Sequence, residues 1–401
     1  FSQTHGYVCK TDKVHNILCV KANSQSTLCL QSHYDIVCLE EGKIPQIIEQ
    51  EGYLKAKDST LGADNGMGCA MMMALMMEQK DCEFLFTSDE EIGLIGANDI
   101  EFKLQSTYML NLDSEAQGEI CIGCAGGIDI FATIKGKQTV PNSTNQDLYT
   151  LSIDNLDGGH SGVDIDKNIP NAIKLISKCV YESNAQLLDI NGGERINSIP
   201  KSCTAIVACS TAPQSTHTNM KIEKIDTSCE HLSLLPKGVI EFIYSFSQGV
   251  RGYDKELGVV LNSINLAIIQ TTIDGLKLSL SARSMDNEEL HNLKIETLAF
   301  LKLCGFTTKT DGKYPAWKPV HNDFTAQVLD IYKRHIPEAS LEAIHAGLEC
   351  AIFKDKYPNM HITSIGPNIY FPHSCREEVE ISSVIKVYAI VQDIVDSVRV
   401  H

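Results

Sequence analysis

The chain has 401 residues, of which 43% are hydrophobic and 21% charged, and its formal net charge at pH 7 is −17. This length predicts two domains, or one large domain with an insertion, and the composition is ordinary for a globular protein with a buried core. The acidic balance argues against nucleic acid and anionic membrane surfaces as partners, and no apolar segment approaches the roughly 20 residues that a membrane helix needs.

The 15 cysteines are scattered, mostly inside apolar runs, and lack the paired spacing of a disulfide scaffold or a zinc ribbon. We therefore expect buried, reduced thiols in a cytoplasmic protein. No signal peptide is visible, although a chain that opens at Phe1 stays compatible with a missing leader.

The first polar residues of interest follow an apolar run. Residues 26–32 predict a strand that ends at His33 and Asp35, and an aspartate two positions after a histidine can hold its imidazole in one tautomer. Asp64 then stands in a glycine-flanked turn that opens a helix over 66–79, where its simplest role is to cap that helix. The helix is apolar on nearly every face, as expected of a helix packed between a sheet and another layer.

Two further apolar runs end in carboxylates. Residues 83–86 predict a buried strand followed by the acidic residues 89–91, and residues 108–112 predict another that ends in Asp113. Adjacent carboxylates repel each other and cost stability unless a cation or a proton is supplied. Either run alone favours a solvated acidic turn. Several such runs together indicate a site, because ligands bind at the carboxyl ends of strands in open α/β sheets.

Residues 128–315 predict a separate α+β domain, inserted into a first domain that comprises residues 1–127 and 316–401. Its expected elements are helices over 169–181 and 288–303 and strands over 128–135, 148–153, 186–190, 203–210, 239–245, 265–271, 276–283 and 307–309. Residues 211–235 are polar without a clear period, which predicts a loop or a weakly ordered insert.

The chain then returns to the first domain, where His373 follows the carboxyl end of a strand expected over 361–365. The loops after the strands of this domain thus carry two histidines and five carboxylates: His33, His373, Asp35, Asp64, Glu90, Glu91 and Asp113. Such donors suit Zn²⁺ first, with Mn²⁺ or Co²⁺ as alternatives. They exceed what one tetrahedral ion needs, whereas two ions sharing a bridging carboxylate, roughly 3.5–4 Å apart, would use them. A carboxylate left without a metal would take a proton from the reacting water.

These motifs resemble the di-zinc metallopeptidases with a catalytic domain and an inserted lid, and among them the aminoacyl-histidine dipeptidase branch. The matching segments span nearly the whole chain in the family's order. They are Ser-His-Tyr-Asp at 32–35, Leu-Gly-Ala-Asp-Asn-Gly at 61–66, Ser-Asp-Glu-Glu at 88–91, Leu-Asp-Ser-Glu at 112–115, Gly-Cys-Ala-Gly-Gly-Ile-Asp at 123–129, Gly-Gly-His-Ser-Gly at 158–162, Asn-Gly-Gly at 191–193, Asn-Ser-Ile-Pro at 197–200, Tyr-Pro-Ala-Trp at 314–317, Ile-His-Ala-Gly-Leu-Glu-Cys at 344–350 and Pro-His-Ser at 372–374. Two departures are a short segment before His33 and a poor match over 211–262.

The resemblance implies an α/β catalytic domain whose mixed sheet is sandwiched by helices, with an inserted α+β lid. It assigns His33 to one metal and His373 to the other, with Asp64 bridging both and Glu91 and Asp113 completing the two coordination spheres. The remaining implied roles are Asp35 orienting His33, Glu90 as general base, His160 stabilising the oxyanion, Arg283 and Asn197 holding the substrate carboxylate, and Glu349 contacting the substrate amino group.

We therefore expect a cytoplasmic enzyme that hydrolyses unblocked dipeptides, preferentially Xaa-His, with a water bridging two metals and Glu90 as the base. Its partner would be a small peptide, and the lid is where a homodimer would form. Related alternatives are a di-zinc tripeptidase, a carboxypeptidase or an amidohydrolase of N-acylated amino acids. A non-catalytic peptide- or metal-binding homologue is a different class, which the presence of Glu90 and of every expected ligand disfavours.

Overall fold

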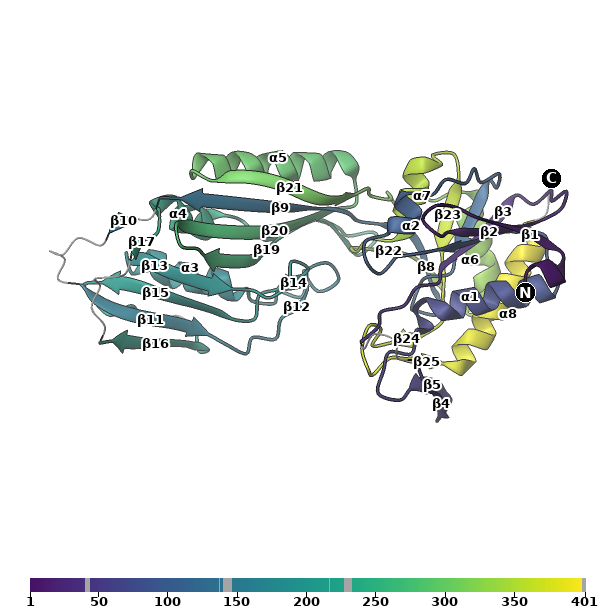
Figure 1. The fold of residues 1–401 in the computed structure, drawn as a ribbon, viewed down its shortest axis with the longest axis horizontal. Helices are drawn as coiled ribbons and strands as arrows, with labels where there is room; N and C mark the ends of the chain where they lie inside the picture. Colours follow the sequence, from purple (N-terminus) through teal and green to yellow (C-terminus); the bar gives the residue numbers. More distant parts are fainter. Residues whose placement is uncertain (40–43, 137, 140–145, 216, 227–232, 399–401) are drawn as a thin grey trace. The chain divides into compact units, whose positions relative to one another are not determined.

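The computed structural model describes residues 1–39, 44–136, 138–139, 146–215, 217–226 and 233–398, and the chain divides into two compact units (Figure 1). Unit 1 comprises Phe1–Cys124, Trp317–Ile344 and Leu348–His401, and unit 2 comprises Ala125–Ala316 and His345–Gly347. The changes of domain were expected at 127/128 and 315/316. The return of three residues, His345–Gly347, to unit 2 was not expected.

Unit 1 is built on a mixed eight-stranded sheet in the order β1-β2-β6-β3-β7-β23-β8-β22. The strands are β1 (Tyr7–Thr11), β2 (Ile17–Lys21), β3 (Leu28–His33), β6 (Glu83–Thr87), β7 (Tyr108–Asn111), β8 (Glu119–Cys124), β22 (Ser340–Ile344) and β23 (His361–Ser364). β3 runs parallel to both β6 and β7, and β7 runs parallel to β23. The carboxyl ends of these four strands therefore meet at one edge of the sheet.

Helices pack on both faces of this sheet. They are α1 (Ala63–Met77), α6 (Asp323–His335) and α8 (Ile381–Ser397) on one face and α2 (Ile95–Asn98) and α7 (Glu349–Lys356) on the other. Leu28 and Leu30 of β3 join the core under the first group and Cys29 joins the core under the second, because successive residues of a strand point to opposite faces. The predicted sheet sandwiched by helices is confirmed. No helix among the described residues is long and apolar enough to cross a membrane.

A second, smaller sheet of unit 1 has the order β24-β25-β5-β4. Its strands are β4 (Ile47–Gln50), β5 (Tyr53–Ala56), β24 (Ile369–Tyr370) and β25 (Glu378–Glu380), and a short 3₁₀ helix η1 (Gln3–His5) precedes β1. Residues 371–377 connect β24 to β25, so this small sheet supports the segment that carries His373.

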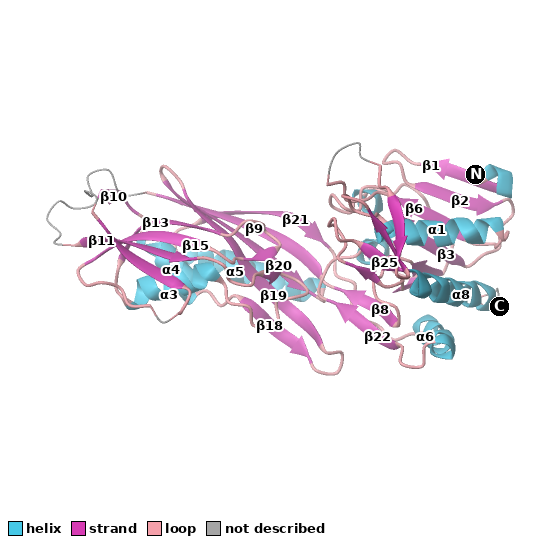
Figure 2. Cartoon of the chain, turned by 90° about the horizontal axis from the view of Figure 1, so that it is seen from below, coloured by secondary structure: helices cyan, strands magenta, loops and turns pink. Residues whose placement is uncertain are grey.

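Unit 2 contains a nine-stranded antiparallel sheet in the order β16-β11-β15-β13-β19-β20-β9-β21, with β18 also paired to β19. Its strands are β9 (Gly126–Lys135), β11 (Asp147–Ile153), β13 (Gln186–Gly192), β15 (Cys203–Cys209), β16 (Met220–Ile225), β18 (Gly249–Asp254), β19 (Val259–Thr271), β20 (Gly275–Ser284) and β21 (Thr307–Tyr314). Two small pairs join β10 (Gln138–Thr139) to β17 (Ser233–Leu234) and β12 (Gly159–His160) to β14 (Ser198–Ile199). Helices α3 (Ala172–Glu182), α4 (Lys237–Ser245) and α5 (Asn287–Leu303) share one apolar core with the large sheet (Figure 2).

Two expectations for this unit were wrong. The strand predicted over 239–245 is part of helix α4, because Val239, Phe242 and Ile243 are spaced to bury one helical face. Part of the loop predicted over 211–235 is the edge strand β16, which has no buried residue and alternates polar with apolar residues too weakly to be recognised. Residue 216 and residues 227–232 lie outside the described residues.

The expectation of reduced thiols fails for one pair. Cys9 and Cys19 face each other in the antiparallel register of β1 and β2 and form a disulfide. This register cannot be read from the spacing of the two residues. Most of the other described cysteines are buried and free, as expected, whereas Cys38 and Cys375 are free and exposed.

Candidate metal centre

The carboxyl edge of the unit 1 sheet brings both predicted histidine ligands to one carboxylate. Asp64 Oδ1 lies 3.0 Å from His33 Nε2, and Asp64 Oδ2 lies 2.9 Å from His373 Nε2. Each of the two imidazole nitrogens also lies close to a second carboxylate: Asp113 Oδ1 is 3.1 Å from His33 Nε2, and Glu91 Oε2 is 3.1 Å from His373 Nε2. Two groups of donors thus share Asp64, and within each group the donor atoms lie within 4.8 Å of one another.

Each donor reaches this point because its strand or turn ends here. His33 is the last residue of β3, and Asp113 and Glu91 follow β7 and β6. The predicted helix cap at Asp64 is wrong. The N-cap position of α1 is Gly62, in a left-handed conformation with φ of 72°, and the Asp64 carboxylate faces the two imidazoles.

Asp35 has two contacts at the site, one expected and one not. Its backbone carbonyl and its Oδ1 lie 3.1 and 3.5 Å from His33 Nδ1, so it can hold the ring with Nε2 turned towards Asp64. Its two carboxylate oxygens also accept hydrogen bonds from the backbone N–H groups of Glu90 and Glu91, each at 3.1 Å. Asp35 therefore fixes both the ring of His33 and the turn that carries the acidic pair.

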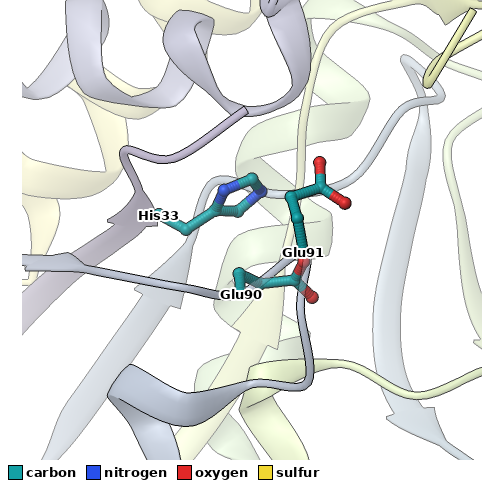
Figure 3. A group of neighbouring side chains, drawn as sticks. All are labelled: His33, Glu90 and Glu91. Carbon is teal, nitrogen blue, oxygen red and sulfur yellow. The ribbon is translucent and has the colours of Figure 1, made fainter. Parts of the chain in front are cut away.

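Glu90 points into the same space as His33 and Glu91 (Figure 3). The three side chains offer donor atoms within 4.8 Å of one another. Burial, followed by the nearby carboxylate of Asp113, raises the pKa of Glu90 to about 9. A carboxyl group in these surroundings holds a proton readily, which suits a residue that must take up and release one.

Glu349 is a buried neighbour of the metal-centre residues His33 and Asp113. Its side chain is fully buried, and its Oε2 accepts hydrogen bonds from Gln31 Nε2 at 2.6 Å and from Thr87 Oγ1 at 2.8 Å. The expected contact of Glu349 with a substrate amino group stays a prediction, and the structure shows that two buried hydrogen bonds hold its side chain.

The electrostatics of the site suit bound cations. Burial lowers the pKa of His33, but the carboxylates of Asp113, Asp35 and Asp64 raise it by more, so that the net shift is upward. Hydrogen bonds to Asp64 and Glu91 raise the pKa of His373 to about 10. Glu91 Oε1 is buried and has no hydrogen-bond partner in the described part of the chain. Five carboxylates around two imidazoles, one with an unpaired buried oxygen, fit two divalent cations.

The predicted residues of unit 2 lie near one another within that unit. His160 belongs to β12, and its Nδ1 accepts from the backbone N–H groups of Gly162 and Val163, both at 3.3 Å. We therefore assign the ring proton to Nε2, which is then a donor. The backbone carbonyl of Asn197 accepts a hydrogen bond from Ser161 N at 2.8 Å, while its side chain is exposed.

Arg283 is a buried cation. Its side chain is only 8% exposed, one guanidinium nitrogen donates to Tyr314 Oη at 2.7 Å, and its Nε has no partner among the described residues. Arg283 is therefore not a solvated surface charge. A buried guanidinium that is short of partners suits the recognition of a carboxylate.

Sequence reasoning missed three residues. Asn65 donates from Nδ2 to Asp113 Oδ1 at 2.5 Å, and the buried Glu377 binds the backbone that leads into Asp64. His345 is buried in unit 2 with its Nε2 2.7 Å from Ser263 Oγ, and burial, followed by the charge of Arg283, lowers its pKa to about 3. Asn65 and His345 lie inside motifs that the sequence analysis had matched. Nothing in the sequence distinguishes Glu377 from the acidic residue beside it.

Comparison with known proteins identifies a matching family and several similar proteins. The model of Peptidase family M20/M25/M40 matches residues 29–397. The cytosol non-specific dipeptidase of Escherichia coli is 30% identical over 433 aligned positions, which cover 96% of this chain and 89% of that protein. The crystal structure of the aminoacylhistidine dipeptidase of Vibrio alginolyticus superposes with a TM-score of 0.85 at 27% identity, covering all of this chain and 91% of the other. Human carnosine dipeptidase 1 shares the fold, with a TM-score of 0.54 at 11% identity.

Proposed function

Because this chain belongs to peptidase family M20/M25/M40, we propose that it is a metallodipeptidase that hydrolyses unblocked dipeptides, with histidine as a favoured C-terminal residue. The preference for Xaa-His is supported by the likeness to the aminoacylhistidine dipeptidase, which extends over the whole chain. Zinc is the proposed metal, since imidazole and carboxylate donors in this number suit it.

The observation that carries the proposal is the carboxylate shared by two ligand groups. His33, Asp64 and Asp113 would hold one cation, and His373, Asp64 and Glu91 the other. When bound, such a pair of cations supplies Lewis-acid activation of water and of the scissile carbonyl. Glu90 lies within reach of His33 and Glu91 but belongs to neither of the two groups that share Asp64, and a hydrogen bond from its backbone N–H to Asp35 holds it in place.

The chain's own groups then carry the protons. Glu90 accepts a proton from the attacking water and passes it to the leaving amine. Burial and Asp113 raise its pKa to about 9, and cations held by the neighbouring ligands would lower this pKa towards the neutral range that general-base catalysis needs. In unit 2, we assign the donor Nε2–H of His160 to the oxyanion and Arg283, with Asn197, to the substrate carboxylate.

Metal content and dipeptide hydrolysis, measured on one sample, test this function. We expect two metals per chain and cleavage of β-alanyl-His or Gly-His that a chelator abolishes. If the protein binds two metals but cleaves neither peptide, the metal site is supported and the proposed substrate becomes a tripeptide, a carboxypeptidase substrate or an N-acylated amino acid. Folded protein that binds no metal would refute the proposal.

Replacement of the base separates catalysis from metal binding. Glu90→Ala should lower kcat by about 10²–10⁴-fold and leave two metals bound, because Glu90 is in neither shared group. The matched control is Asp89→Asn, which removes the adjacent carboxylate. Asparagine tolerates the left-handed φ of 53° at this position, so this variant should retain activity. Wild-type kcat in Glu90→Ala would remove Glu90 from the mechanism.

Two further properties are part of the proposal. We propose a cytoplasmic protein, as the name of the E. coli relative indicates for that enzyme, and a homodimer formed through unit 2. Cell fractionation tests the first, and light scattering of the intact chain compared with a variant carrying charged substitutions on unit 2 tests the second.

A further inference from the structure

Glu377 makes four hydrogen bonds that the mechanism above does not use. It lies in the connection between β24 and β25, four residues after His373, and it is only 3% exposed. Its carboxylate accepts from four consecutive backbone N–H groups: Oε2 from Leu61 at 2.8 Å and Gly62 at 3.0 Å, and Oε1 from Ala63 at 2.7 Å and Asp64 at 3.3 Å. The last of these residues is the one that faces both imidazoles.

The local chain explains why an outside carboxylate is needed here. The first N–H groups of a helix have no partner within the helix, and a side chain at the N-cap position usually binds them. In α1 that position is Gly62, which has no side chain, and no side-chain cap forms. A residue with a Cβ would meet Ile36 Cγ2 at 2.8 Å and would be strained at φ of 72°. Asp64 and Asn65 have non-helical backbone angles, and the side chain of Asn65 accepts a hydrogen bond from Gly68 N. Glu377 therefore binds the N–H groups of the turn that leads into the helical part of α1, from a distant part of the chain.

We propose that Glu377 is a positioning residue that fixes the bridging carboxylate of Asp64 between His33 and His373. This inference rests on the proposed two-metal function. Glu377 binds the backbone N–H of Asp64, while the side chain of Asp64 spans the two imidazoles. One connection thus carries both a metal ligand, His373, and the group that holds the bridging ligand in place. The position of that connection consequently sets how the two ligand groups are spaced.

The variant Glu377→Gln tests this with little change in shape. Its side-chain NH₂ would face two backbone N–H donors, so at least two of the four hydrogen bonds are lost. We expect the metal-free variant to bind Zn²⁺ about 10–100-fold more weakly in competition with a chromophoric chelator. We also expect the visible absorption of its Co²⁺ form to change, because the bridging geometry changes.

The matched control is Glu378→Gln, the same change one residue further on. Glu378 forms an ion pair with Lys55 at 2.6 Å, and no hydrogen bond links its side chain to residues 61–64 in the described structure. This control should keep the wild-type Zn²⁺ affinity and Co²⁺ spectrum. If it weakens metal binding as much as Glu377→Gln does, the effect is not specific to the hydrogen bonds between Glu377 and residues 61–64, and the inference is wrong.

A purely structural role predicts a different result. Glu377→Gln would then lower only the melting temperature, with Zn²⁺ affinity and the Co²⁺ spectrum unchanged, and this outcome would overturn the proposal. Should Glu377→Gln fail to fold, Glu377→Asp keeps the charge on a shorter side chain and is expected to change both metal readouts in the same direction. Failure of the proposed function itself is seen separately, as wild-type protein that binds fewer than two metals.

Discussion

Replacing the buried acid Glu349 by glutamine should stabilise unit 1 at high pH. Its Oε2 has two donors, Gln31 and Thr87, while its Oε1 is buried and has no partner in the described structure. Burial raises the pKa of Glu349 from 4.5 to about 8, so the folded protein holds this carboxyl protonated where the unfolded chain ionises it. Glutamine fills the same volume, can accept the same two hydrogen bonds and cannot ionise.

The sign and size follow from the difference in proton binding. Between pH 4.5 and 8 the folded state binds more protons at Glu349 than the unfolded state, so stability falls as pH rises through this window and falls no further above it. For the metal-free protein, a change in pKa from 4.5 to about 8 corresponds to at most roughly 5 kcal/mol of unfolding free energy. Relative to wild type, Glu349→Gln should therefore gain stability by up to about 1.4 kcal/mol per pH unit across this window.

Tryptophan fluorescence gives the assay. The chain has a single tryptophan, Trp317, which is buried in unit 1, so its signal reports the unfolding of that unit. Urea unfolding of metal-free wild type and Glu349→Gln is compared at pH 5.5, 7 and 8.5, with the exposed Glu338→Gln as control. A stability difference that is the same at all three pH values would refute the reasoning, as would an equal pH dependence in the control.

Two other predictions concern the cations and the substrate. Metal binding at neutral pH should release protons, because the pKa of His373 is raised to about 10 and a metal ligand must be the neutral imidazole. Calorimetry of metal binding in two buffers of different ionisation enthalpy measures this release. Identical binding heats in the two buffers would contradict the prediction. Arg283→Met should raise KM for a dipeptide by about 10–100-fold, because a charged hydrogen bond to the substrate carboxylate is lost. The same variant should change KM little for the corresponding dipeptide amide. An equal effect on both substrates would show that Arg283 does not bind the carboxylate.

Much of unit 1 could be predicted because its signals are local. Apolar runs bounded by polar residues mark β3, β6 and β7, and the position of His33 or Asp113 directly after such a run fixes where it lies in the sheet. Parallel neighbours then bring these residues together with no further information. Five carboxylates at one edge of a sheet also indicate a cation site by themselves, because they repel each other unless cations or protons are bound.

Contacts between segments that are distant in the sequence could not be predicted. Glu377 binds residues more than 300 positions earlier, and no pattern around it shows that its carboxylate is turned inwards. Glu349 lies in a matched motif, but the motif does not show that the side chain is buried. The apolar run that forms α4 was mistaken for a strand because short runs of this kind fit either structure until their neighbours are known.

The arrangement of charges at the centre makes protons and divalent cations competitors for the same places. Without metal, the imidazoles of His33 and His373 and the carboxyl of Glu90 all have raised pKa values, because each lies among carboxylates or is buried beside them. The fold thus tolerates its acidic cluster by taking up protons, and bound cations must displace them. Acidification should then remove activity by releasing metal before the sheet that carries the ligands unfolds, since the strand ends stay in place through backbone pairing that does not titrate.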